Sequence, residues 1–525
     1  MRVSTGGRKI CLLLALPAAL SGANAGAQQL GQVLSEKELP QMESAAAGKN
    51  SRQIVPRLDT RLTWSDNAGA AHEKNADWIL EVSPGIRYTD DRGRLTGIFD
   101  ARWRNVGYAR SDGLNQSFVT LQSANTLEAV QDMLFIDLDS NISRNNRSPF
   151  YGRISDDRLN VAKEDEVRTW ALGPRLQFRL GDAAQGALRY RSSWLDGNML
   201  KFGGQREQLW SGQIGNPHAF RYMGWNVEYS RSATEYDSTD QEVRRQLGRA
   251  TIFINVASEL RLRFTGGRES NDYGFGDEED KNIWGGGFDW QPTPRTTVSL
   301  LSERRAFGNG YSFNLGHRAR RTLWEISGSR GISSSMDSLG GSLYQDPQFL
   351  AWFNNPNLIA MYPDPVQREA LVRGLLHYPS GDFITNAYYR DETWRAGVTY
   401  TGVRNTITLS AQHSKRKRIS LGSLSAFDSF ALANDLEMIS GTLSLTRRLS
   451  SLSSLNAMVT HWRTRGEGMS SGLDTRRTSA SLGLNTRLGL QTQAGLTYNH
   501  QRSDTDVTDG DYTENSVSAN LGMTF

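Results

Sequence analysis

Residues 516–525 at the end of the chain read SVSANLGMTF. Apolar residues take every second position of this stretch, and they are Val517, Ala519, Leu521, Met523 and Phe525. Small polar residues fill most of the positions between them. Because successive side chains of a β-strand point to opposite faces, the stretch is predicted to be a strand with one apolar and one polar face.

The same alternation recurs throughout the chain, for example over residues 57–64, 78–88, 95–104, 134–143 and 169–180. These segments are roughly 9 to 13 residues long, which suits a tilted transmembrane strand better than the usual strand of a soluble domain. Aromatic residues gather near the segment ends, as in the two interfacial girdles of membrane barrels. We therefore predict an all-β chain that forms a transmembrane, antiparallel, up-and-down β-barrel.

The connections between the predicted strands are of two kinds. Ten short connections alternate with eleven mostly longer ones, which is the asymmetry of periplasmic turns and outer loops. Ten hairpins plus a first and a last strand make 22 strands, our best count. The stretch 311–330 could hold one long strand instead of two. The predicted range is therefore about 18 to 22 strands.

The two ends of the chain differ in character. Residues 1–27 combine a basic start, a short apolar core and small-residue cleavage sites, so they are predicted to be a cleaved signal peptide. Residues 28–56 are polar and are expected to form a short periplasmic segment before the barrel of residues 57–525. Cys11, the only cysteine, lies in the signal, so we expect a mature chain without disulfides.

One long outer connection, at about residues 331–391, interrupts the regular pattern. Asp364 followed by Pro365 is a typical helix start, so a short helix is expected there. This helix could pack on the rim of the barrel, or it could fold into the lumen as a constriction. Barrels of about 22 strands are usually plugged, which makes the second alternative relevant.

Several short motifs recur together in one known family. They are WQPTPRT at 290–296, RAFG at 305–308, HRARRT at 317–322, WSDN at 64–67 and DPVQR at 364–368. In combination they resemble the PEP-CTERM system-associated outer-membrane proteins, β-barrels encoded beside exopolysaccharide and PEP-CTERM sorting genes. The resemblance covers most of the chain. It implies location in the outer membrane of a Gram-negative bacterium and a role in exopolysaccharide export or assembly, and it carries over no catalytic residue.

The polar faces of the predicted strands carry many charged side chains, which we expect to line the lumen. The candidates are Arg61, Arg87, Arg102, Arg104, Arg175, Arg179, Arg189, Arg191, Arg261, Arg263, Arg318, Arg320, Asp100, Asp137 and Asp139. Guanidinium groups bind carboxylates and phosphates and stack on sugar faces, so such a lining suits an anionic or hydroxyl-rich polymer. Alternatively, the opposed charges only pair with one another and hold the wall in shape.

Two charge runs are predicted in outer loops. The acidic run is Asp277, Glu278, Glu279 and Asp280, and the basic run is Lys415, Arg416, Lys417 and Arg418. The first could hold a divalent cation and the second could bind lipopolysaccharide phosphates, although solvated loops are the simpler interpretation. The seven histidines show no metal-ligand spacing, so no metal site, cofactor or enzyme activity is predicted.

The remaining expectations concern partners and function. A terminal strand ending in Phe525 resembles the signal that barrel-assembly machinery recognises. Three of the 60 basic residues lie in the signal, which leaves 57 against 56 acidic ones and argues against nucleic acid. We expect outer-membrane lipids as surroundings and a periplasmic polysaccharide-export partner. The leading hypothesis is passive export of an exopolysaccharide, and the alternatives are a structural or assembly barrel with a closed lumen and a general diffusion porin.

Overall fold

The computed structural model describes residues 52–525, except 91–92, 147–149, 151–163, 198–203, 218, 238–240, 273–278, 340–384, 420–429, 431–432, 469–472 and 507–509. Within this part of the chain, no helix is long and apolar enough to cross a membrane. Helical structure includes the short α1 (Ser335–Leu339) and the 3-10 turn η2 (Asp112–Leu114). The predicted helix near Asp364 lies outside the described residues.

Long strands make up most of the described chain. They are β1 (Gln53–Ser65), β2 (Asp77–Asp90), β3 (Leu95–Tyr108), β4 (Gln116–Val130), β5 (Leu134–Asn146), β6 (Glu164–Leu180), β7 (Ala184–Gly197), β8 (Gln205–Asn216), β9 (Met223–Tyr236), β10 (Gln241–Ala257), β11 (Leu260–Asp272), β12 (Glu279–Thr293), β13 (Thr296–Arg305), β14 (Gly308–Arg318), β15 (Thr322–Ser333), β16 (Tyr389–Thr401), β17 (Asn405–Arg418), β18 (Asp435–Arg448), β19 (Ser453–Glu467), β20 (Leu473–Arg487), β21 (Thr492–Thr505) and β22 (Tyr512–Thr524).

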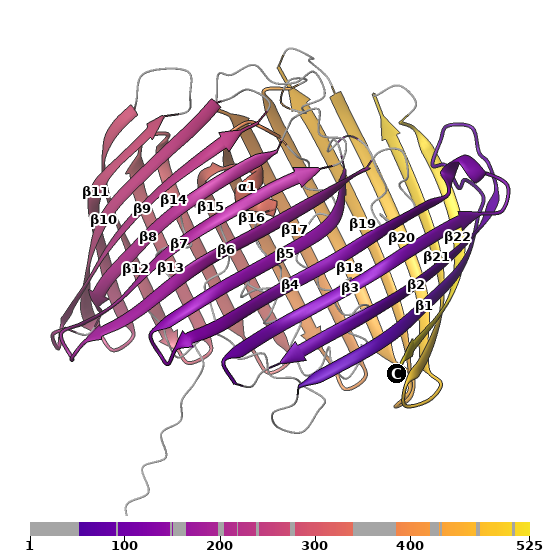
Figure 1. Ribbon diagram of the computed structural model, residues 1–525, viewed down its shortest axis with the longest axis horizontal. Helices are drawn as coiled ribbons and strands as arrows, with labels where there is room; N and C mark the ends of the chain where they lie inside the picture. Colours follow the sequence, from indigo (N-terminus) through magenta and orange to yellow (C-terminus); the bar gives the residue numbers. More distant parts are fainter. Residues whose placement is uncertain are drawn as a thin grey trace, which may run out of the picture.

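These strands form one closed antiparallel barrel (Figure 1). Each strand pairs with its neighbour in sequence, and the first and last strands close the ring. The closing seam runs from the pair Arg57–Thr524 to the pair Ser65–Ser516. The all-β fold and the best count of 22 strands are therefore confirmed. The ambiguous stretch 311–330 contains parts of two strands, β14 and β15.

Short turns join each even-numbered strand to the next odd-numbered one, at the end of the barrel where β1 begins and β22 ends. By the rule that outer-membrane barrels have short periplasmic turns, this end is the periplasmic end. β1 begins at Gln53, four residues before the predicted start of the barrel at 57. The long connection runs between Ser333, the last residue of β15, and Tyr389, the first of β16.

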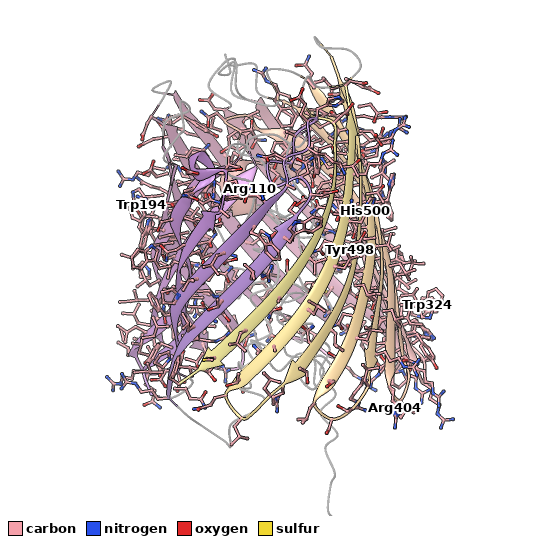
Figure 2. All side chains as sticks on the ribbon, turned by 90° about the vertical axis from the view of Figure 1, so that its right-hand side faces the viewer. Arg110, Trp194, Trp324, Arg404, Tyr498 and His500 are labelled. Atoms are coloured by element: carbon pink, nitrogen blue, oxygen red, sulfur yellow. The ribbon has the colours of Figure 1, made fainter. Side chains whose placement is uncertain are left out.

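The outer surface of the barrel is apolar and the inner surface is polar. On β2, Trp78 and Leu80 are 50% and 48% exposed, whereas the alternating Glu81 is 7% exposed. Figure 2 shows Trp194 and Trp324 pointing away from the barrel in the same manner. This arrangement is the reverse of a soluble protein, and it fits a wall whose outside contacts hydrocarbon.

The closing seam can be tested with an engineered disulfide. The hydroxyl oxygens of Thr63 and Ser518 lie 2.9 Å apart across the β1–β22 pair. We predict that Thr63→Cys with Ser518→Cys forms a disulfide in the folded barrel, because facing side chains at this spacing meet the geometric requirement. Electrophoresis of the denatured, non-reduced protein should show a faster-migrating looped chain. Thr60→Cys with Ser518→Cys, which places one cysteine on the outer face, is the control; equal cross-linking of both pairs would contradict the seam.

Candidate functional site

The inner wall carries clusters of ion pairs, and the densest one surrounds Asp100 on β3. Three guanidinium groups from three adjacent strands approach this carboxylate. Arg57 of β1 pairs with it directly, and Arg87 and Arg102 lie 3.7 and 3.5 Å away. All four side chains are at most 18% exposed. One carboxylate thus compensates several cations in a sparsely solvated part of the wall.

Three other predicted arginines differ in their environment. Arg104 pairs with Glu81 at 2.9 Å, and both side chains are largely buried. Arg61 stands opposite Glu81 in the β1–β2 register. Arg179 is exposed close to the turn between β6 and β7. The first two therefore belong to the wall, whereas Arg179 lies at its periplasmic edge.

A second cluster joins β5, β6 and β7. Asp137 accepts ion pairs from Arg175 and Arg189, each at 3.3 Å. The neighbouring inward carboxylate, Asp139, pairs with Arg191 at 3.2 Å. The structure therefore brings together five predicted lumen residues that come from three strands.

The remaining predicted arginines fall into two groups. Arg261 and Arg263 both pair with Asp289, at 2.9 and 3.0 Å, and they belong to the inner wall. Arg318 is the last residue of β14 and Arg320 lies in the following turn, and both are exposed. The assignment of these two to the lumen is corrected: they sit on the periplasmic rim, where the strand alternation has ended.

The prediction of lumen residues did not include Arg249, which is at the centre of another strong cluster. Arg249 of β10 pairs with Glu228 of β9 and, at 2.7 Å, with Glu303 of β13. Nearby, Arg305 pairs with Glu269 at 2.6 Å. The alternation of β10 places Arg249 on the inward face, so the signal for this residue is present in the sequence. The partner Glu303 lies three strands away and could not be read from one strand.

The other part of the wall is almost uncharged. On β17–β22 the inward positions are mostly hydroxyl residues, including Thr408, Ser410, Ser440, Thr442, Ser444, Thr446, Thr460, Thr464, Thr475, Ser479, Ser516 and Ser518. Several of them pair across strands, such as Thr442 with Thr460 at 3.1 Å. We call this surface the hydroxyl wall. It offers donors and acceptors at short side chains, in contrast to the long arginines of the charged wall on β1–β13.

The acidic run was predicted to be an outer loop, and for its described residues this assignment is corrected, because Glu279 and Asp280 are the first two residues of β12. Asp277 and Glu278 are outside the described residues. Asp280 pairs with Arg268 at 2.6 Å, and both side chains are exposed. Within the described ranges, no group of three histidine, cysteine or acidic residues is arranged to hold a metal ion.

The basic run Lys415–Arg418 was predicted to be an outer loop, and this assignment is corrected. These residues form the end of β17. Arg416 points inward to Asp391 at 3.3 Å, while Lys415 and Lys417 each pair with a carboxylate of β18 at 3.5 Å. β17 continues beyond the part that has an apolar outer face. Basic residues occupy both faces there, so the sequence shows no alternation by which this end of the strand could be predicted.

The long connection between β15 and β16 enters the lumen at its first turn. Figure 1 shows α1 within the outline of the barrel. Met336 packs in a buried cluster with Val167 of β6 and Leu195 of β7. Both are inward-facing residues, and β6 lies nine strands from β15 around the wall. Met336 is only three residues beyond Ser333 at the end of β15, so the facing parts of the wall lie close together at this level and α1 fills the lumen between them.

Polar contacts hold both ends of this connection against the wall. Asp337 of α1 pairs with Arg245 of β10 at 3.4 Å, and Glu207 of β8 lies at the same distance from Arg245. The Arg245 guanidinium also stacks over the ring of Tyr388, 5.0 Å from its centroid. The Tyr388 hydroxyl donates to Thr234 of β9 at 2.9 Å. One arginine thus links both ends of the connection to the charged wall.

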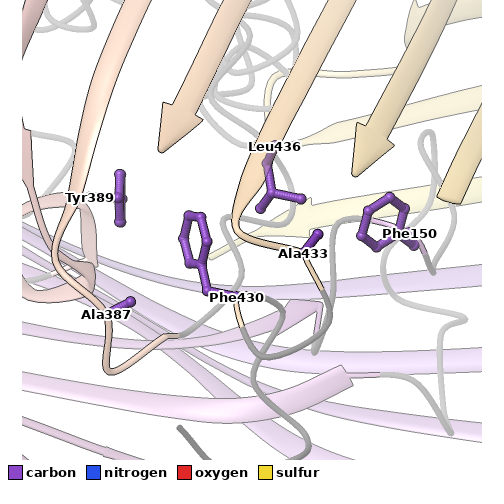
Figure 3. Packing of buried hydrophobic residues seen from close by; sticks show 6 residues of the cluster. All are labelled: Phe150, Ala387, Tyr389, Phe430, Ala433 and Leu436. Carbon is purple, nitrogen blue, oxygen red and sulfur yellow. The ribbon is translucent and has the colours of Figure 1, made fainter. Parts of the chain in front are cut away.

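A buried apolar cluster joins three outer connections (Figure 3). Its members are Phe150, Ala387, Tyr389, Phe430, Ala433 and Leu436. The rings of Tyr389 and Phe430 stack with centroids 5.4 Å apart. Phe150 follows β5, whereas Ala433 of the same cluster lies between β17 and β18, so the cluster crosses the mouth of the barrel. Gly466 leaves the room for this packing, because a Cβ there would lie 2.9 Å from both Phe150 and Ala433.

A closed 22-stranded antiparallel barrel with an apolar exterior and a polar, charged interior is an outer-membrane β-barrel, and this chain is one. No protein-family model and no curated protein matches its sequence.

Among solved structures, the chain is similar to the siderophore receptor PirA from Pseudomonas aeruginosa, with 8% identity and a TM-score of 0.47 over 91% of this chain and 81% of that one. It is also similar to the ferric-catecholate import receptor Fiu from Escherichia coli K12, with 10% identity and a TM-score of 0.48 over 91% and 82%. OccK3 from Pseudomonas aeruginosa matches with 10% identity and a TM-score of 0.35 over 90% and 96%. At these identities the likeness concerns the fold alone.

The cluster around Asp100 predicts an unequal cost of removing charges. Asp100→Asn leaves three guanidinium groups without their shared carboxylate and should lower the free energy of unfolding by about 3–5 kcal/mol. Asp280→Asn removes an exposed pair and should cost about 0–1 kcal/mol. Urea unfolding of both variants in detergent micelles measures the difference. If both substitutions lowered the free energy of unfolding by the same amount, the cluster around Asp100 would contribute no more to stability than an exposed ion pair does.

Proposed function

We propose that this barrel is a passive channel for export of an exopolysaccharide. The motifs shared with barrels of exopolysaccharide loci support this cargo. The observation that carries the proposal is the lining of the lumen, which combines a hydroxyl wall on β17–β22 with a charged wall on β1–β13. Hydroxyl groups can exchange hydrogen bonds with sugar hydroxyls and with water at little net cost, which suits a polymer that must slide and not stay bound.

The charged wall has a complementary role in this proposal. Its arginines are held in fixed positions by carboxylates, as Arg175 and Arg189 are by Asp137. Such planar groups can stack on sugar rings or pair with acidic substituents of a polymer. Because each cation already has a partner in the wall, an additional anionic group gains little net energy, so transit remains reversible.

The inner part of the long connection would act as the gate. It is held to the wall by Met336, Asp337 and Tyr388, which come from its two ends. None of the barrel's strand pairings depends on these side chains, so the connection could move aside while the barrel remains intact. Delivery of the polymer would fall to a periplasmic partner, since the lumen itself has no source of energy.

The apolar cluster across the mouth favours a second candidate, a structural or assembly barrel whose lumen stays closed. Burial of Phe150, Phe430 and Leu436, all about 1% exposed, stabilises the bridged mouth. In this alternative the clusters of the lumen serve only to maintain the wall. Electrical conductance separates the two candidates, because a closed barrel passes no ions.

The gate predicts a specific change in conductance. Ser333 and Tyr389 face each other at the end of the β15–β16 pair, so an Asn-Gly turn can replace residues 334–388 without altering either strand. We expect this variant to conduct several-fold more than the unmodified barrel in planar bilayers, and we expect dextran to block its current reversibly. Grafting the same turn in place of residues 237–240, between β9 and β10, should leave conductance unchanged. If neither of the two grafted barrels conducts ions, the barrel with a closed lumen is the favoured alternative.

The cargo is tested in cells. Deletion of the gene should remove polysaccharide from the cell surface while its cytoplasmic precursors persist, because only the last step of export is lost. Immunoblots or lectin staining of the surface, together with assays of precursor pools, provide the measurement. Restoration of surface polymer by the unmodified gene is the expected control. Normal surface polysaccharide in the deletion strain would exclude this cargo.

A further inference from the structure

We propose that one half of the periplasmic rim is a docking surface for an acidic protein partner. The surface consists of five consecutive short turns, at residues 293–296, 317–322, 401–405, 447–453 and 486–492. We call it the arginine arc. This inference concerns a partner of the barrel and does not depend on the cargo proposed above.

The arc has a strongly biased composition. Its five turns contain eight arginines and no aspartate or glutamate. These arginines are all exposed, and among them Arg295, Arg321, Arg404 and Arg487 form no ion pair with any described residue. Unpaired guanidinium groups on one face create a positive potential that favours an acidic surface in docking.

Exposed aliphatic side chains stand among these arginines. Val403 is 80% exposed, Leu488 is 63% exposed and Leu490 is fully exposed at the tip of its turn. Leu449 and Leu452 on the neighbouring turn are also exposed. Protein interfaces combine apolar anchors with arginine in this way, whereas a purely electrostatic surface would have no use for leucine at its tips.

The backbone holds the arc in one shape. The amide of Arg318 donates to the carbonyl of Arg295 at 2.8 Å, which ties the first turn to the second. The amide of Arg448 donates to the carbonyl of Arg404, also at 2.8 Å, and thereby ties the third turn to the fourth. The other neighbouring turns are joined in the same manner. A surface organised before binding loses little entropy when a partner docks.

The asymmetry of the rim indicates a protein and not the membrane. On the other half of the rim, the turns carry Asp132, Asp182 and Glu259, mixed with arginines. The inner leaflet surrounds the whole barrel, so binding of lipid headgroups would favour basic residues around the full circle. A partner that docks on one side requires them on that side only. Charge complementarity therefore points to an acidic protein surface with apolar residues.

The test uses the complete mature barrel in phosphatidylcholine nanodiscs, with a fluorescent peptide rich in glutamate and leucine as the probe. Arg404→Glu with Arg487→Glu should weaken binding of the peptide about tenfold or more, since charge reversal in an interface adds repulsion to the lost attraction. Arg94→Glu with Arg221→Glu, on the other half of the rim, is the matched control and should leave the affinity within about twofold. Leu488→Ser with Leu490→Ser tests the apolar part and should also weaken binding while all arginines remain.

The same measurement in nanodiscs that contain phosphatidylglycerol addresses the lipid alternative. We expect the affinity for the peptide to remain unchanged, because a surface that binds protein and not lipid headgroups stays available when the lipid is changed. Loss of peptide binding in these nanodiscs, or equal affinities of the two arginine variants, would overturn the proposal. Conductance of the Arg404→Glu with Arg487→Glu variant should equal that of the unmodified barrel, so failure of the docking surface and failure of the channel are distinguishable.

Discussion

Closure of the backbone hydrogen-bond ladder is the constraint on which the whole structure depends. A strand in hydrocarbon cannot leave its amide and carbonyl groups unpaired, so an open sheet edge is excluded and the first strand must pair with the last. Here the seam joins residues 57–65 to residues 516–524, at opposite ends of the chain. Every strand between them must therefore be present and in register before any edge disappears, which makes the barrel one cooperative unit.

The same constraint places all polar chemistry inside. Because the outer face of each strand must be apolar, the alternating positions carry the charges, and their low exposure forces them to pair, as around Asp100. A ring of 22 strands also encloses more space than the wall side chains fill. In this chain the outer connections extend across that space, with α1 against β6 and β7, and with Phe150 and Phe430 from different connections in one cluster at the mouth.

These relations explain what the sequence could predict. Alternation and turn positions are local signals, so they predicted the fold, the strand count and most wall residues, including the partners Asp137 and Arg175. They failed where alternation ends or is hidden, at Arg318, Arg320 and the basic end of β17. Contacts across the lumen, such as Met336 with Leu195, join residues far apart in sequence by the curvature of a closed ring. The periodicity within a strand carries no information about that curvature. Entry of the long connection into the lumen was therefore predicted only as one of two alternatives, beside packing on the rim.

The barrel is also asymmetric around its axis, both in its lumen and on its periplasmic rim, and the two asymmetries overlap in part. The hydroxyl wall covers β17–β22, and three of the five turns of the arginine arc, with half of its arginines, adjoin the periplasmic ends of these strands. The charged wall and the contacts of α1 occupy the other side of the lumen, on β1–β13. A partner on the arc would therefore present its cargo beneath the part of the wall with the shortest side chains and the fewest charges. The arc lies at the periplasmic end of the barrel, whereas α1 and the ends of the long connection lie at the opposite ends of β15 and β16, so the connection could move without disturbing the docking surface.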